Sequence, residues 1–563
     1  MTLKTSSRKI NPFLGMIKST YRKNFGIIIV LCIMALLYCP GVYVVNFENF
    51  FKDRYTLEAT WGFTGADFSR KFGTIIAAFA PIFVMIFNFV NFSYLYKKNA
   101  SDVFHSFPLT RAELLLSRMI AGVLSALTPV LLCTLCYVVT VIFNPWLGNF
   151  GTLLYYLAIT LVITLLWSSF SMIFVVCAGS SFDLSLSFIG TNISIMFVGI
   201  IVHIIFLEKL TGYAGTIGLL LRQISIPFFC MFHSSISFWI QSIVYILAFT
   251  FVSLFLYNRR KAEKGGTAYA YKLMYYICGV LASICGGYFI GMIFDALSND
   301  FSPVFWLFSL LGAIICSLIY GLITNRGFKG ASRSLLTGVI AWVILILIVV
   351  ISSFGGFGFS KRVPNKNRVE TAQIYFMSEH IEFTDPDDVI ALHEKTIANA
   401  LKEKSLAIYE KYRYEDDTCA TIDFMYTLKN GNMVNRSFYV PISSVENELL
   451  TIFKNEERYD NIVKDSFVNN PMISAIDVTY YNKSSVETEC TITQEEYKAL
   501  LETYWQETQT LLEPEDIYAT SFTNIWFNFT IGEKKTEYYR IEIPYSFERT
   551  YQLLEKYTYS NYY

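Results

Sequence analysis

The sequence predicts a polytopic α-helical membrane protein of about nine transmembrane helices, followed by a C-terminal extracytoplasmic α+β domain with an internal duplication. Of the 563 residues, 54% are hydrophobic and only 16% are charged, whereas about 25% are charged in soluble proteins. The apolar residues gather in runs of about 20, which is long enough for a helix to cross roughly 30 Å of hydrocarbon. Residues 359–563 are instead polar and rich in tyrosine. The formal net charge of zero gives no bias towards nucleic acid.

Nine apolar segments have the length of a membrane span. The first is too long for a cleaved signal peptide, and no small-residue cleavage site follows it. The predicted spans are residues 26–45, 73–95, 116–142, 152–177, 184–207, 236–257, 274–294, 303–324 and 335–357.

The lysines and arginines of the loops predict the orientation of these spans. If the N-terminus is cytoplasmic, seventeen of these basic residues fall in inner loops and six in outer loops. Because nine spans are an odd number, the polar region that begins at residue 359 is then predicted to lie outside. We therefore expect a multi-pass protein with a cytoplasmic N-terminus.

The segments between the spans suggest further divisions of the chain. Residues 1–25 place five apolar side chains on one helical face and basic residues on the other, which predicts a helix in the cytoplasmic interface. Residues 26–257 form a six-span core, in which the segment 209–235 is broken by glycines and a proline. We expect that segment to be re-entrant or interfacial, because a full span there would reverse every later loop. A basic loop (258–273) and three more spans (274–358) follow.

A β-hairpin is predicted in the polar region. The stretches 421–428 and 434–440 flank Asn430-Gly431, a pair that favours the positive φ angles of a type I′ turn. A shift of 103 residues brings this hairpin onto a second one without a gap. The matching pairs are Ile422 with Ile525, Phe424 with Phe527, Val440 with Ile543, and Pro441 with Pro544.

The match extends beyond the hairpin. The strand 369–377 corresponds to 472–480 in the same register, and helical stretches around 386–403 and 494–509 correspond with a small offset. We therefore predict two related strand–helix–hairpin–helix units, which form an α+β domain by duplication. Their predicted limits are residues 359–465 and 466–563.

No pattern in this domain predicts catalysis or a resident metal. Its only histidines, His380 and His393, have no nucleophile or metal-ligand spacing beside them. Three nearby aspartates are better explained as a helix N-terminus than as a calcium cluster; they are Asp385, Asp387 and Asp388. Catalytic and metal-binding residues are therefore predicted to be absent, and a binding or gating domain is the default interpretation.

Other features have structural explanations. The chain has no G-x-x-x-x-G-K-[S/T] sequence, so it has no P-loop for ATP of its own. The stretch GGYFIG (286–291) is a small-residue pattern for helix packing inside a span. Asn88 and Asn91 are expected to form interhelical hydrogen bonds. Cys419 and Cys490 could form a disulfide or remain two thiols, and the sequence leaves both open.

The loop KKNASDVFHSFPLTRAEL (97–114) is longer and more patterned than a connection between spans requires. Ser101 or Asp102 can cap a short helix, Pro108 ends it, and Thr110 with Glu113 forms a capping box for the next span. This pattern predicts a stiff elbow over residues 97–113. Two arrangements stay open on physical grounds: the aromatic side chains face the cytoplasm, or they lie back in the membrane interface.

The segment KKNASDVFHSFPLTRAELLLSRMIAG resembles the region after the second span in bacterial ABC-2 type transporter permeases. Two other cytoplasmic stretches are similar to segments of the same family: NRRKAEKGG (258–266) and NRGFKGASRS (325–334). The resemblance covers about residues 10–360, and the extra spans and outer domain fit a long form of the family. Phe107 stands where a leucine is expected, which preserves an apolar contact.

This resemblance implies a permease subunit of the bacterial cell membrane that pairs with separate ABC ATPase subunits. ATP and magnesium would bind to that partner, and this chain would have no cofactor. The elbow would be the coupling helix, with contacts through Asp102, Val103, Phe104, His105, Phe107, Pro108 and Arg111. The basic segments would contribute Arg259, Arg260, Lys261, Glu263, Arg326, Lys329 and Arg333.

Further partners implied by the resemblance are a second permease copy or paralogue and membrane lipids, with no nucleic acid. The transported substrate would be a lipid, a peptide or an antibiotic. A different class also fits the sequence: a non-transporting receptor whose outer domain binds a ligand and signals through the spans. A neighbouring ATPase gene would favour the transporter, and a neighbouring kinase gene alone would favour the receptor.

Overall fold

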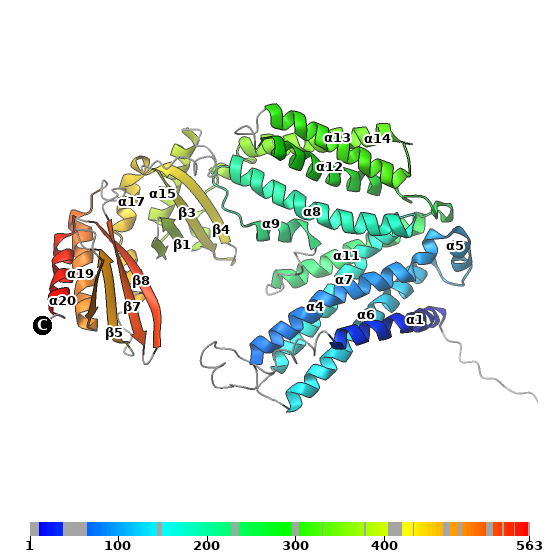
Figure 1. The fold of residues 1–563 in the computed structure, drawn as a ribbon, viewed down its shortest axis with the longest axis horizontal. Coiled ribbons are helices and arrows are strands. Elements are labelled where there is room, and N and C mark those ends of the chain that lie inside the picture. Colours follow the sequence, from blue (N-terminus) through cyan, green and yellow to red (C-terminus); the bar gives the residue numbers. More distant parts are fainter. Residues whose placement is uncertain are drawn as a thin grey trace, which may run out of the picture. The chain divides into compact units, whose positions relative to one another are not determined.

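In the described part of the computed structural model, eight helices are long and apolar enough to cross a membrane, as expected of a polytopic membrane protein. They are α4 (Gly65–Asn91), α6 (Arg111–Phe143), α7 (Phe150–Cys177), α8 (Ser181–Lys209), α11 (Ile236–Arg259), α12 (Lys272–Asp295), α13 (Pro303–Asn325) and α14 (Ala331–Ser353) (Figure 1). A ninth candidate is the pair Pro12–Lys23 (α1) and Phe25–Leu37, which is bent by 56°. The eight helices match the second to ninth predicted spans, with shifted ends, and Phe25–Leu37 overlaps the first.

The structure describes most but not all of the chain. The predicted first span is described only as far as Leu37, so its second half lies outside the described residues. The described residues are 11–37, 65–143, 149–226, 230, 236–295, 303–328, 330–376, 379–402, 419–431, 433–465, 473–481, 487–513, 522–531, 534–544 and 546–560.

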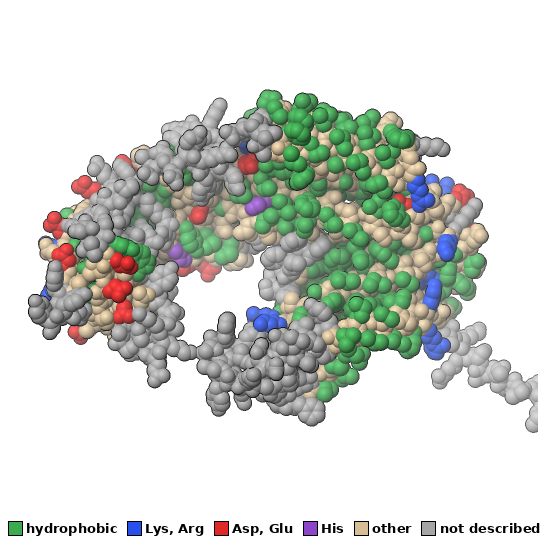
Figure 2. Space-filling model, in the orientation of Figure 1, with side chains coloured by type: hydrophobic (Ala, Val, Ile, Leu, Met, Phe, Trp, Pro, Cys, Tyr) green, Lys and Arg blue, Asp and Glu red, His purple; other side chains and the backbone are tan. Residues whose placement is uncertain are grey.

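Contacts divide the chain into two units. One contains residues 1–201 and 218–345, and the other contains 202–217 and 346–563. The last turns of α8 and α14 therefore belong with the C-terminal domain. Figure 2 shows hydrophobic side chains over the long helices and acidic side chains over the C-terminal sheets.

The helix α7 is the most buried candidate span of the first unit, and it packs against α4 and α11. Asn88 of α4 donates through Nδ2 to the hydroxyl oxygens of Ser168 (3.2 Å) and Ser171 (2.9 Å) on α7. This contact confirms the predicted interhelical hydrogen bond of Asn88, and Asn91 donates to the carbonyl of Arg118 at 3.4 Å. Inside a bilayer such bonds satisfy polar groups that lipid cannot.

The glycines of GGYFIG hold α12 against α13. A Cβ at Gly286 would lie 2.1 Å from Cys316 Sγ, and one at Gly287 would lie 2.8 Å from the carbonyl oxygen of Ser309. Side chains there would force the two helices apart. The prediction of a helix-packing pattern is confirmed.

Between α8 and α11 the structure has α9 (Ile217–Ile224), a helix of eight residues. Eight residues rise only about 12 Å, so α9 is too short to cross the hydrocarbon. Whether the segment 209–235 enters the membrane or lies on it stays a prediction.

The C-terminal region contains two four-stranded antiparallel sheets with the same topology. The first subdomain has the strand order β2-β1-β3-β4, with β1 (Val369–Phe376), β2 (Glu379–Phe383), β3 (Cys419–Leu428) and β4 (Met433–Pro441). The second has the order β6-β5-β7-β8, with β5 (Ile473–Tyr481), β6 (Glu487–Ile492), β7 (Phe522–Ile531) and β8 (Lys534–Pro544).

Helices complete each subdomain. The first contains α15 (Asp387–Lys402) and α17 (Glu446–Phe453), and the second contains α19 (Gln494–Leu511) and α20 (Glu548–Ser560). The strands β2 and β6 were not predicted from the sequence. Because they pair with β1 and β5, each unit is hairpin–helix–hairpin–helix and not strand–helix–hairpin–helix. The strand β2, EHIEF, is short and mostly polar, and its edge position explains its weak pattern.

The predicted hairpin is confirmed. The strands β3 and β4 pair from Cys419–Pro441 to Thr427–Met433. The predicted type I′ turn is wrong, because Gly431 has a φ of 75° but Asn430 has no positive φ, and a type I′ turn needs one at both positions. The shift of 103 residues also holds here, because Phe424 pairs with Arg436 and Phe527 pairs with Tyr539.

The predicted register of the first strand is wrong by one residue. Ala372 pairs with Tyr426, and the equivalent pair in the second sheet is Ile476 with Phe529, so the strands correspond with a shift of 104. With a shift of 103, the residue equivalent to the buried Ile374 would be Asp477. With a shift of 104 it is Val478, which is buried as well. Because side chains alternate between faces, one residue decides which of them enter the core.

The hydrophobic cores of the two subdomains have an aromatic contact between helix and sheet at the same position. His393 of α15 stacks on Phe424 with ring centroids 4.5 Å apart, and its Nδ1 lies 2.9 Å from the Tyr426 hydroxyl. Tyr497 of α19 takes this position in the second subdomain, 4.7 Å from Phe527. His393 is completely buried, and this burial lowers its pKa from 6.5 to about 3.

A short helix, α18 (Glu456–Asp465), links the subdomains. The guanidinium of Arg458 donates to the carbonyl of Phe453 (3.1 Å) and to the hydroxyl of Tyr504 (2.8 Å). Arg458 is 2% exposed. It therefore joins the end of the first subdomain to the central helix of the second.

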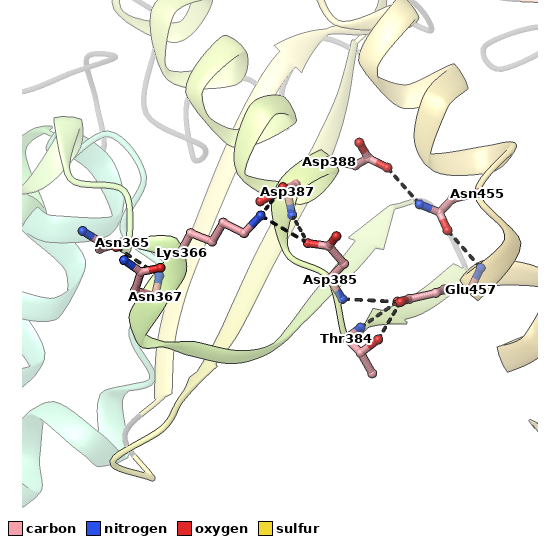
Figure 3. A network of polar contacts seen from close by, with 9 residues as sticks. All are labelled: Asn365, Lys366, Asn367, Thr384, Asp385, Asp387, Asp388, Asn455 and Glu457. Carbon is pink, nitrogen blue, oxygen red and sulfur yellow. Dashed lines mark hydrogen bonds and ion pairs between the residues drawn. The ribbon is translucent and has the colours of Figure 1, made fainter.

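The three aspartates around the start of α15 form a helix N-terminus, as predicted (Figure 3). Asp385 Oδ1 accepts from the backbone N–H of Asp387 at 3.2 Å, and Lys366 forms an ion pair with Asp387. Glu457 of α18 accepts from the backbone N–H of Thr384 at 2.6 Å. No group of three metal-ligating side chains occurs among the described residues.

The two cysteines of this region lie in different sheets. Cys419 is the first residue of β3. Cys490 lies in β6, buried in the core of the second subdomain as a free thiol, so the two form no disulfide.

We predict that His393 makes the domain less stable in acid. The unfolded histidine gains a proton as the pH falls below about 6.5, while the buried one stays neutral until about pH 3. Stability is therefore lost as the pH falls, by about 1.4 kcal/mol per unit, or about 2 kcal/mol at pH 5. His393→Phe keeps the stacking and should flatten this slope in thermal unfolding between pH 7 and 5.

His380→Gln is the matched control, because His380 is exposed and stacks on Tyr375. It should leave the slope unchanged. An unaltered slope in His393→Phe would mean that another group takes up the proton.

Candidate functional site

The predicted elbow is a short helix that precedes α6. After the 3₁₀ turn η1 (Ser93–Tyr96), α5 covers Lys98–His105. Thr110 then donates its backbone N–H (2.8 Å) and its hydroxyl (2.9 Å) to Glu113, whose own N–H donates to the Thr110 hydroxyl at 3.2 Å. The predicted capping box is confirmed, and it fixes the direction in which α6 leaves the turn.

One side of the elbow is apolar and exposed. Val103 is 59% exposed and Phe107 is 40% exposed, and Asp102 and Pro108 are exposed beside them. Phe107 follows the end of α5, and its ring lies 5.5 Å from that of Phe104. The side chain of His105 lies outside the described residues.

Phe104 differs from the expectation that it faces outward. Its ring lies 4.5 Å from the ring of Tyr94, and the guanidinium of Arg118 lies over it at 4.1 Å. One residue after Val103, a helical side chain points about 100° away, here towards the spans. Phe104 therefore anchors the elbow, and Val103 and Phe107 remain as its exposed contacts.

Arg118 was not predicted as part of this site. It is 5% exposed, although it belongs to α6, a candidate span. Besides its contacts with Phe104 and Tyr94, it donates to the carbonyl of Asn91. An arginine inside an apolar segment was the available signal in the sequence.

Arg111 ties the start of α6 to the end of α11. Its guanidinium donates to the carbonyls of Asn258 (2.9 Å) and Arg260 (3.0 Å). Because a guanidinium is planar and has several N–H groups, one side chain can hold both acceptors.

Arg260 donates hydrogen bonds to several backbone carbonyls at once. It is 5% exposed, and its acceptors in the described structure are backbone carbonyls. Two lie at the C-terminal end of α7, Val176 (2.5 Å) and Ala178 (2.8 Å), and a third is Leu95 at 3.0 Å. A cation at a helix C-terminus satisfies its free carbonyls and the negative end of its dipole. Burial lowers the pKa of Arg260, yet arginine stays charged at neutral pH.

The backbone after Arg260 follows the turn between α7 and α8. Gly179 donates to the carbonyl of Ala268 (3.1 Å), and Ala270 donates to that of Cys177 (2.8 Å). A Cβ at Gly179 would lie 1.9 Å from the Thr267 carbonyl oxygen, so only glycine fits there. We call these segments together the Arg260 cluster: residues 93–118, 175–179 and 257–271.

The other predicted basic residues are exposed. Arg259 lies over the ring of Phe255 at 4.1 Å, and Lys261 and Glu263 face solvent. Arg326 and Arg333 are exposed around the turn between α13 and α14, and Lys329 lies outside the described residues. Figure 2 shows Lys and Arg side chains along the edge of the helices where Figure 1 labels α5.

Comparison of the chain with models of known protein families, with curated proteins and with solved structures found no match.

We predict that Arg260→Ala destabilises the helical unit by about 3 kcal/mol or more, because it leaves several buried carbonyls without donors. Arg260→Lys should recover little of this, since one ammonium cannot reach carbonyls of both α7 and Leu95. Arg259→Ala is the matched control and should cost less than about 1 kcal/mol. Thermal unfolding of the purified chain in detergent measures all three variants, and equal effects of Arg260→Ala and Arg259→Ala would contradict the prediction.

Proposed function

We propose that this chain is the membrane-spanning permease subunit of an ATP-driven ABC transporter of the ABC-2 type. It exports or expels a lipid, a peptide or an antibiotic across the bacterial cell membrane. Its N-terminus is cytoplasmic, and its C-terminal domain, two duplicated α+β units, is extracellular. It works as a homodimer or heterodimer with a second permease and with separate ABC ATPase subunits, and it has no catalytic residues of its own.

The observation that carries the proposal is the construction of the elbow. A coupling element needs an exposed contact for its partner and a rigid connection to the spans. Val103 and Phe107 provide the first, with side chains 59% and 40% exposed. Phe104, which packs on Arg118 and Tyr94, provides the second.

The connection reaches several spans. Tyr94 follows the end of α4, and its hydroxyl lies 2.8 Å from that of Tyr257 on α11. Arg111 links α6 to the end of α11, and Arg260 links the end of α7 to Leu95. A push on α5 would therefore be transmitted to α4, α6, α7 and α11 together. Packed elements transmit such displacements because interiors have low compressibility.

The energy source in this proposal is a partner protein. The sequence has no P-loop, so ATP and magnesium are assigned to the ATPase subunits. Closure of the ATPase dimer would move the elbow, and the linked spans would tilt. The basic residues that face solvent near the cluster, Arg259 and Lys261, would contribute to the same docking surface.

We expect the double variant Val103→Ala with Phe107→Ala to lose the ATPase while the chain stays folded. Truncating two apolar contacts at the centre of an interface costs about 2 kcal/mol, so retention should fall about tenfold or more. The complex is purified in mild detergent, the ATPase is identified by mass spectrometry, and its yield per permease is measured. Phe357→Ala, at an exposed phenylalanine after α14, is the matched control and should retain the ATPase.

Phe104→Ala separates docking from folding, because its ring packs inward. It should lower the unfolding temperature, which the double variant should leave unchanged. A wild-type complex that contains no ATPase and hydrolyses no ATP would overturn the proposed function and favour a receptor.

A further inference from the structure

The loop after α14 presents two phenylalanines to the surroundings of the protein. Phe354 is 86% exposed and Phe357 is 92% exposed. Four consecutive residues, 355 to 358, have positive φ angles, and the third of them is Phe357, with a φ of 55°. Such a conformation is strained for a large side chain, so it persists only where its surroundings impose it.

The surroundings of the loop are well defined. Gly356 donates to the carbonyl of Ile351 at 2.9 Å, and Ser360 donates to that of Gly355 at 3.2 Å. A Cβ at Gly356 would lie 2.9 Å from a methyl group of Leu210, just after α8. The loop is therefore held at the ends of two candidate spans, where exposed aromatic rings are typical of the membrane interface.

An arginine with few partners lies beside this loop. The guanidinium of Arg436, on β4, stacks on the ring of Phe359 at 3.6 Å and is only 6% exposed. Its hydrogen bond goes to the carbonyl of Asn435, at a long 3.4 Å, and its Nε has no partner among the described residues. A charge this buried is costly unless hydrogen bonds or a counter-charge compensate it.

A second arginine increases the positive charge. Arg362 is exposed in the same loop, and together with burial, the larger cause, it lowers the pKa of Arg436 to about 10. Neither arginine has an ion pair with an acid among the described residues. The position of Arg436 is taken by Tyr539 in the second subdomain, so the feature belongs to the first subdomain alone.

We infer that this loop and the two arginines form a binding site for an anionic phospholipid. Its phosphate accepts hydrogen bonds from Arg362 and Arg436, and its acyl chains lie against Phe354 and Phe357. Guanidinium groups bind phosphate strongly because the hydrogen bonds are charge-assisted. A free phosphate would explain the arginines but leave two adjacent exposed phenylalanines without a role. The site does not depend on the proposed transport function.

The test uses the full-length chain in detergent, stripped of lipid and titrated with phosphatidylglycerol, phosphatidylcholine or inorganic phosphate. Thermal unfolding measures each affinity, and native mass spectrometry counts the bound lipids. Phosphatidylglycerol should raise the unfolding temperature, and phosphatidylcholine should raise it far less. Arg362→Ala should weaken phosphatidylglycerol binding about tenfold, the effect of losing one charge-assisted contact.

Arg549→Ala is the matched control, because Arg549 is an exposed arginine on α20 of the second subdomain. It should bind phosphatidylglycerol like the wild type. The double variant Phe354→Ser with Phe357→Ser should weaken lipid binding and leave any effect of inorganic phosphate unchanged. Arg362 is exposed, so Arg362→Ala is expected to fold even where Arg436 variants do not.

Equal stabilisation by phosphatidylglycerol and phosphatidylcholine would overturn the proposal, as would wild-type affinity in Arg362→Ala. Stabilisation by inorganic phosphate that equals that by lipid, with no effect of the phenylalanine variant, would show a phosphate site and not a lipid site. None of these results bears on ATPase binding, so the two proposals fail separately.

Discussion

The helical unit depends on one interaction, the capping of α7 by the buried guanidinium of Arg260. The helix α7 is the most buried of the candidate spans, and its C-terminal carbonyls end inside the protein and not in water. Arg260 satisfies them and reaches Leu95 with the same group. The neighbouring loops take their places around it: the turn at Gly179 is closed by the backbone after residue 265, and Arg111 holds the carbonyl of Arg260 itself.

Much of the fold could be predicted from the sequence because its signals are local. Runs of apolar residues locate the helices, Asn430-Gly431 locates a hairpin turn, and Thr110 with Glu113 locates the start of α6. The small-residue contact of α12 with α13 was predictable for the same reason, because glycine spacing is visible in the chain. These features need no knowledge of distant residues.

The features that were predicted wrongly or not at all depend on long-range contacts. The side of α5 that Phe104 occupies is decided by Arg118, fourteen positions later, and by the ring of Tyr94. The correspondence between β1 and β5 is decided by the packing of Ile374 and its equivalent Val478, and the gapless sequence match misplaced it by one residue. The acceptors of Arg260 lie more than eighty positions away in the sequence. Its basic character was visible, but its role as a helix cap was not.

The contacts of the first subdomain with the ends of α8 and α14 have a mechanical consequence. Gly212, just after α8, lies so close to the ring of Phe438 that a Cβ would be 2.6 Å from it, and Arg436 covers the ring of Phe359, just after α14. The first subdomain is thus clamped to the ends of two helices that lie far apart in the sequence. A rotation of the last turn of α8 or of α14 about the helix axis would therefore turn the sheet of the first subdomain with it.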